Sequence, residues 1–113
     1  LRLSHVPAHR ALAEAVLHDP DPAVRSAALT AFGQLGSLRD LSRLLPLLDD
    51  PVATCQAEAA NTLISLPGMN AALAQAQLDV PRSILGRLHW QHALERRGWL
   101  PPDTLLELPA HVA

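Results

Sequence analysis

The side chains of this chain with the most versatile chemistry are six histidines and one cysteine. His89 and His92 are three residues apart and His5 and His9 are four apart, so each pair could lie on one helix face. A zinc site needs three or four ligands in a tetrahedral arrangement. No further histidine or carboxylate stands at a matching spacing, and Pro7 restricts the backbone between His5 and His9. We therefore expect structural or surface histidines, with no metal and no cofactor.

Nucleophilic and acid–base chemistry also lack a complete set of residues. Cys55 takes the place in an apolar pattern that Val24 holds 31 positions earlier, which indicates a buried, unreactive thiol. Asp49 and Asp50 precede Pro51, where one of them is expected to cap the helix that the proline begins. The sequence has no phosphate-binding glycine loop and no nucleophile elbow. It predicts a protein that is not an enzyme.

Side chains of the kind that dominate protein interfaces gather in residues 82–99. This segment holds both tryptophans and four arginines against a single acid, Glu95. Trp and Arg are the residue types most enriched in binding hot spots. The candidate partner-binding residues are therefore Arg87, Trp90, Arg96, Arg97 and Trp99.

The alternative interpretation of residues 82–99 is a terminal helix of the fold. In that interpretation Ile84, Leu85, Leu88 and Trp90 pack on the preceding helices, while the arginines are solvated. The sequence leaves both interpretations open.

Composition excludes several classes of function. The net charge is −2, the pI is about 6.3 and lysine is absent, whereas nonspecific nucleic-acid binding needs many cationic contacts. We therefore expect no nucleic-acid partner. No apolar run is long enough to span a membrane, and the one cysteine fits a reducing compartment, so a cytoplasmic location is expected.

Residues 18–36, HDPDPAVRSAALTAFGQLG, carry the signals of one amphipathic helix. Asp21 can cap a helix start and Pro22 suits the first helical position, so the helix is expected to begin at Pro22. Arg25 is expected to lie away from the centre of the buried stripe. That stripe consists of apolar residues at helical spacing, namely Val24, Ala27, Ala28, Ala31, Phe32 and Leu35.

The end of this helix is marked as clearly as its start. Gly36 can adopt the left-handed conformation that closes a helix. Ser37 and Asp40 have the spacing of a capping box for the next helix. The connection between the two helices is therefore predicted to be very short.

The same pattern recurs after a shift of 31 positions. The shift relates Asp19 to Asp50, Phe32 to Leu63 and Leu35 to Leu66, and each copy follows another apolar segment, at 11–19 and 41–50. One unit is therefore a helix, a turn and a second helix. We expect repeat 1 at about residues 7–36, repeat 2 at about 37–67, and a degenerate third unit with a C-terminal tail at about 68–113. From its first residue, Leu1, we expect a piece of a longer protein or a mature product.

Two prolines and a glycine shape the expected helices further. Pro46 lies inside an apolar segment and is expected to kink its helix, because it removes a backbone hydrogen bond. Pro81 is expected to start a helix that runs to about Arg97, and Gly98 to close it.

The segments LLPLLDDP and DPDPAVRSAALTAFGQLG resemble HEAT repeats, in particular the short bacterial kind called PBS-lyase HEAT-like. The resemblance implies an all-α fold, an α-solenoid of about six to seven helices stacked as antiparallel hairpins in a right-handed superhelix. It also implies a ladder between a turn aspartate, Asp19 or Asp21, and Arg25. Gln56 departs from that ladder in the second copy.

The resemblance implies a non-catalytic module that binds a protein partner or acts as a scaffold. The alternatives are an accessory subunit of a chromophore-attaching or other enzyme, and an architectural spacer in a larger chain. An enzyme-assisting role would need converging polar groups, for which the sequence offers His89, His92 and Arg96. The apolar residues Leu1 and Leu3 also make end-to-end self-association an expectation.

Overall fold

The computed structural model describes residues 7–100, with side chains from residue 11 onward. These residues form helices and turns, with no β-strand among them. The α-helices are α1 (Pro7–Val16), α2 (Pro22–Leu35), α3 (Leu41–Leu44), α4 (Ala53–Ile64), α5 (Ala71–Ala76) and α6 (Ile84–Arg97). Three short 3-10 segments join them, η1 (Leu38–Asp40), η2 (Leu45–Asp49) and η3 (Gln77–Asp79).

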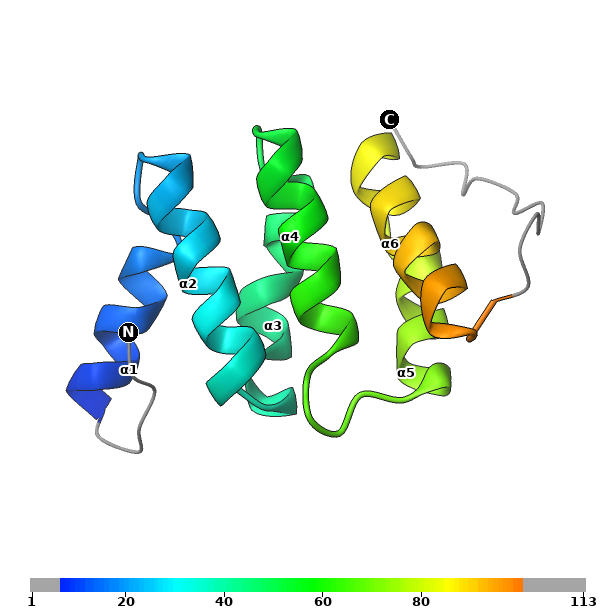
Figure 1. Cartoon of the computed structure of the whole chain (residues 1–113), viewed down its shortest axis with the longest axis horizontal. Coiled ribbons are helices and arrows are strands. Elements are labelled where there is room, and N and C mark those ends of the chain that lie inside the picture. Colours follow the sequence, from blue (N-terminus) through cyan, green and yellow to red (C-terminus); the bar gives the residue numbers. More distant parts are fainter. Residues whose placement is uncertain (1–6, 101–113) are drawn as a thin grey trace.

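The helices stack as hairpins in two rows, as Figure 1 shows. Helices α2, α4 and α6 form one row, and α1, α3 and α5 form the row behind it. Within the first row α4 packs against both α2 and α6. The predicted all-α fold of stacked helical hairpins is confirmed. Leu1, Leu3 and His5 lie outside the described residues.

The core runs through all three hairpins as a single cluster. Phe32, Leu63 and Leu94 stand at the same place in α2, α4 and α6, 31 positions apart, and all three belong to this cluster. Cys55 is buried as expected, whereas Val24 is only half-buried. Apolar residues that recur at 31-position spacing in the sequence therefore form the hydrophobic core.

The buried face of α2 is rotated from the predicted stripe. Ala27 and Leu35 are exposed, with Leu35 at 51% of its full accessibility, so the prediction was wrong for both. Arg25 and Leu29 are buried in their place. The reason is that α2 has two neighbours, α1 behind it and α4 beside it, and the buried face is centred between them.

The start of α2 is as predicted, but its end is not. The helix begins at Pro22, and Oδ1 of Asp21 accepts a hydrogen bond from the Ala23 amide at 2.9 Å. Gly36 is not left-handed, because its φ is −85°. A Cβ atom there would lie 2.5 Å from the carbonyl oxygen of Phe32, so close approach of the chain requires this glycine. The capping box of Ser37 and Asp40 is present.

Pro46 and Pro81 lie close to points where the helical structure changes or begins. The helix that contains Pro46 changes at Leu45 from the α-helical form of α3 to the 3-10 form of η2. The predicted start at Pro81 was wrong, since α6 begins at Ile84 after the cap residue Ser83. Gly98 ends α6 in the left-handed conformation, with φ 79°, as predicted.

The third hairpin keeps the register of the first two in its second helix. Helix α6 begins 31 positions after α4, as α4 begins 31 positions after α2. In the first half of this hairpin, α5 and η3, the repeat spacing is 30 positions, one fewer than elsewhere. The buried residues Ala74 and Leu78 follow Leu44 and Leu48 by this distance. One extra residue between η3 and α6 restores the spacing.

Candidate functional site

The polar ladder predicted from the resemblance links two hairpins. Nε of Arg25 donates to Oδ2 of Asp50 at 2.8 Å, and Nη2 donates to Oδ1 at 3.0 Å. The expected carboxylate partners, Asp19 and Asp21, were wrong, since Asp19 offers its backbone carbonyl to Nη1 instead, at 2.8 Å. The hydrogen bonds with Asp50 raise the pKa of the Arg25 guanidinium. This bidentate pair joins the first repeat to the second.

The next rung is neutral. Nε2 of Gln56 donates to the carbonyl oxygen of Asp50 at 2.7 Å, as Arg25 does to Asp19 one repeat earlier. Oε1 of Gln56 is buried and has no hydrogen-bond partner. Gln56 therefore keeps the hydrogen bond to a backbone carbonyl of its own repeat, as Arg25 does. As a neutral side chain it forms no ion pair with the following repeat.

The adjacent acids do not cap α4 as predicted. Helix α4 begins at Ala53, and its cap residue Val52 makes no side-chain cap hydrogen bond. Oδ1 of Asp50 accepts from the Val52 amide at 2.9 Å, and Oδ1 of Asp49 accepts from the Ser83 amide at 2.7 Å. Asp50 is used by the ladder and Asp49 by the start of α6, which leaves both acids in structural positions.

Two of the five candidate partner-binding residues are part of the interior. Trp90 is fully buried, and its Nε1 donates to the carbonyl oxygen of Ala74 at 2.9 Å. Arg87 is 3% exposed, and its Nη1 donates to the carbonyl oxygen of Leu78. The prediction that Trp90 and Arg87 bind a partner at the surface was wrong, because the face of α6 that carries them is buried against α5 and η3.

The alternative interpretation of this segment needs correction as well. Ile84, Leu85 and Leu88 are 44%, 54% and 49% exposed, so they do not pack on the preceding helices as expected. Arg82 is buried, not solvated, and this burial lowers its pKa against the attraction of Asp49. Helix α6 therefore buries its tryptophan and shows part of its aliphatic surface.

The other three candidate residues lie at the C-terminal end of α6. Arg96 and Arg97 are exposed, and Nη2 of Arg96 donates to Oδ1 of Asn61 on α4 at 2.6 Å. The guanidinium carbon of Arg97 lies 4.8 Å from the ring centroid of Trp99, a cation–π distance. Gln75 donates to the Trp99 carbonyl at 2.8 Å, which anchors this turn to α5.

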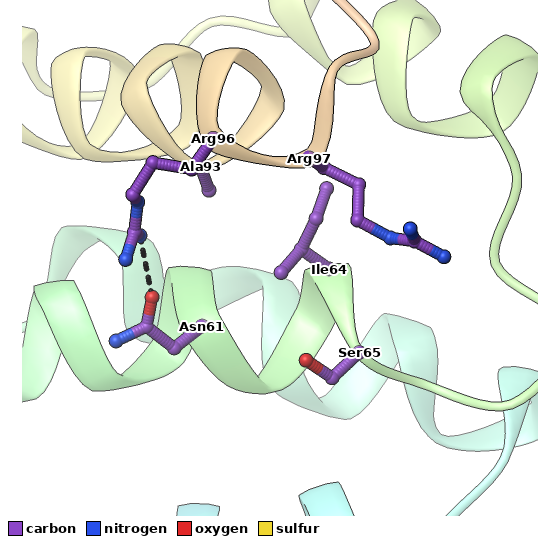
Figure 2. A pocket seen from close by; sticks show the side chains of 6 residues that line it. All are labelled: Asn61, Ile64, Ser65, Ala93, Arg96 and Arg97. Carbon is purple, nitrogen blue, oxygen red and sulfur yellow. Dashed lines mark hydrogen bonds between the residues drawn. The ribbon is translucent and has the colours of Figure 1, made fainter.

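A hollow of about 270 Å³ opens between the ends of α4 and α6, and Figure 2 shows the side chains around it. Arg96 reaches across from α6 to Asn61, and Arg97 extends along the other end of the opening. The hollow is lined by Asn61, Ile64, Ser65, Ala93, Arg96 and Arg97. This is the place where the structure brings predicted binding residues together.

The α4 side of the hollow was not predicted from the sequence. Asn61, Ile64 and Ser65 belong to the repeat before the one that carries Arg96. The 31-position register contains a usable signal, because Ser65 and Arg96 are equivalent positions of adjacent repeats. Residues 82–99 taken as an isolated segment do not reveal this neighbour.

The histidines and the cysteine do not join this hollow. His92 is exposed, with its Nδ1 3.9 Å from Oε2 of Glu95, and His89 is half-buried. Within residues 7–100, no three His, Cys, Asp or Glu side chains are grouped so that they could hold a metal ion. The Sγ atom of Cys55 donates to the Pro22 carbonyl at 3.4 Å in the seam between α2 and α4.

Stacked hairpins with a 31-position register define a helical-repeat solenoid. The sequence matches the family model for HEAT repeats over residues 2–64. The chain therefore belongs to the HEAT repeat family. No curated protein and no solved structure matches it. Of the helices in residues 7–100, none has the length and apolarity needed to cross a membrane.

Proposed function

We propose that this chain is a non-catalytic protein-interaction module whose contact surface is the row formed by α2, α4 and α6. HEAT repeats commonly serve as protein-interaction or scaffold modules, which supports the general assignment. The observation that supports this particular surface is the hollow between α4 and α6, where Arg96 and Arg97 surround an apolar floor. Exposed arginines beside a buried apolar patch are typical of interface hot spots.

Polar side chains of neighbouring helices in this row are held together by hydrogen bonds. Thr30 on α2 donates to Oε1 of Glu58 on α4 at 2.8 Å, and Arg96 on α6 donates to Asn61 on α4 at 2.6 Å. Such bonds reduce the side-chain freedom that a partner would otherwise have to restrict. The row therefore offers a surface that is partly ordered before binding.

A photo-crosslinking experiment tests the placement of the contact surface. A photoreactive amino acid replaces Gln34, which is exposed on α2, or Ser42, which is exposed on α3 in the other row. After irradiation in lysate of the organism that encodes the protein, we expect a protein adduct from position 34 and none from position 42. Adducts from position 42 alone would show that the contact surface lies on the other row.

The enzyme-assisting role has weaker support from the geometry. Of His89, His92 and Arg96, only Arg96 borders the hollow between α4 and α6. The short bacterial subtype and end-to-end self-association stay predictions. We also propose a cytoplasmic location, which the free, buried thiol of Cys55 fits.

A further inference from the structure

The polar groups around the hollow between α4 and α6 share one property, which is that they can donate hydrogen bonds. Arg96 and Arg97 have donors only. Asn61 uses its Oδ1 to accept from Arg96, which leaves its amide nitrogen as the other polar atom, and Ser65 adds an exposed hydroxyl. No carboxylate stands among the residues that line the hollow. The hollow is therefore suited to a ligand that accepts hydrogen bonds and carries negative charge.

The floor of the hollow is apolar. Ala93 is 1% exposed and Ile64 is 9% exposed, so both are buried in the interface between α6 and α4. The volume of about 270 Å³ is just below the range of small-molecule pockets, which is about 300–1,000 Å³. It fits one or two side chains of a peptide, one of them aliphatic.

We propose that the hollow binds an acidic segment of a protein partner, with aspartate or glutamate carboxylates at Arg96 on one end of the opening and at Arg97 on the other. An aliphatic neighbour in that segment rests on the exposed edge of Ile64. Arginine binds carboxylates through paired hydrogen bonds, and Arg96 retains donors beyond the one that Asn61 occupies. This inference rests on the proposed function, since it names the kind of partner for the same surface.

The charges around the hollow favour a peptide over a nucleic acid. Glu58 lies one turn before Asn61 on α4, and Glu95 directly precedes Arg96. The continuous phosphates of a nucleic-acid backbone would be repelled by these acids, whereas the carboxylates of a short peptide segment need to approach only the arginines. The absence of lysine and the net charge of −2 point the same way.

Fluorescence anisotropy with a defined probe tests the proposal. The probe is a fluorescent, N-acetylated, C-amidated peptide in which glutamate alternates with leucine, and the control peptide has glutamine in place of glutamate. We expect the glutamate peptide to bind and the glutamine peptide not to bind. Arg97→Gln should weaken binding about tenfold or more, because it removes charge-assisted hydrogen bonds.

Two further variants separate recognition from bulk charge and from folding. Arg39→Gln changes the net charge equally at an exposed position of η1 outside the hollow, so binding should be unchanged. Asn61→Asp places a carboxylate beside Arg96, which should weaken peptide binding about tenfold without lowering the melting temperature. Stability and affinity then respond independently.

Three outcomes would overturn the proposal. These are equal loss of binding in Arg39→Gln and Arg97→Gln, equal binding of the glutamate and glutamine peptides, or displacement of the peptide by a single-stranded oligonucleotide. If any of these occurs while position 34 still crosslinks a protein, the acidic ligand is wrong and the contact surface remains. If position 34 does not crosslink while position 42 does, the contact surface is wrong.

Discussion

Gly86 is expected to be the least replaceable residue of α6, for a reason that is steric. It is the third residue of the helix and stands at the position of Cys55 in α4. A Cβ atom at Gly86 would overlap the carbonyl oxygen of Leu48 and lie 2.9 Å from Oδ1 of Asp49. The clashing atom belongs to the backbone of η2, which cannot avoid the contact by changing a side-chain rotamer. We predict that Gly86→Ala destabilises the protein.

The expected size follows from two opposing effects. Alanine is favoured over glycine in a helix by about 1 kcal/mol. Overpacking a tight interior costs about 1–3 kcal/mol, and the rigid carbonyl of Leu48 places this case in the upper half of that range. Retreat of η2 would also strain the bond from Ser83 to Asp49. The net loss is about 1–2 kcal/mol, a fall in melting temperature of roughly 5–10 °C.

Gly33→Ala is the matched control. Gly33 also lies within a helix, but a Cβ atom there would meet Thr62 Cγ2 at 3.6 Å, an ordinary contact. This variant should gain up to about 1 kcal/mol from helix propensity. Thermal and urea unfolding followed by far-UV circular dichroism measure both variants. The reasoning is refuted if Gly86→Ala is as stable as the parent protein, or if both variants shift stability in the same direction.

Two other substitutions probe the buried polar contacts. Trp90→Phe keeps an aromatic ring but leaves the carbonyl of Ala74 without the indole N–H, so urea unfolding should show a loss of about 1–3 kcal/mol. An unchanged unfolding midpoint would mean that the indole bond adds nothing. Asp50→Ala removes the carboxylate that holds the buried guanidinium of Arg25, and should lower the melting temperature more than Glu14→Ala, which breaks an exposed pair with Arg43 worth at most about 1 kcal/mol. Equal shifts in the two variants would contradict a special role for the ladder.

Much of the fold follows from local signals in the sequence. The start of α2 depends on Asp21 and Pro22, the end of α6 on Gly98, and the stacking on a 31-position register that is visible as a pattern. These signals act within a few residues, so they have the same meaning in any tertiary context. Gly36 shows the limit, since the helix ends at this glycine as predicted but the left-handed conformation predicted for it was wrong.

The candidate site was predictable only in part. Arg96, Arg97 and Trp99 were identified by residue type, and the structure places Arg96 and Arg97 at a hollow. Arg87 and Trp90 have the same residue types and are buried. Residue type alone could not separate these two groups, because burial depends on how α6 is rotated against α4 and α5.

The sequence by itself determined the repeat, the helical hairpins and most of their ends, because capping and periodicity are properties of neighbouring residues. Only the tertiary structure decided that Arg25 pairs with Asp50 of the next hairpin and that α4 supplies one wall of the hollow. Both depend on which helix faces cover one another. A helical period marks a face as apolar without showing which neighbour covers it. In α2 and α4, moreover, alanines occur on more than one face of the helix.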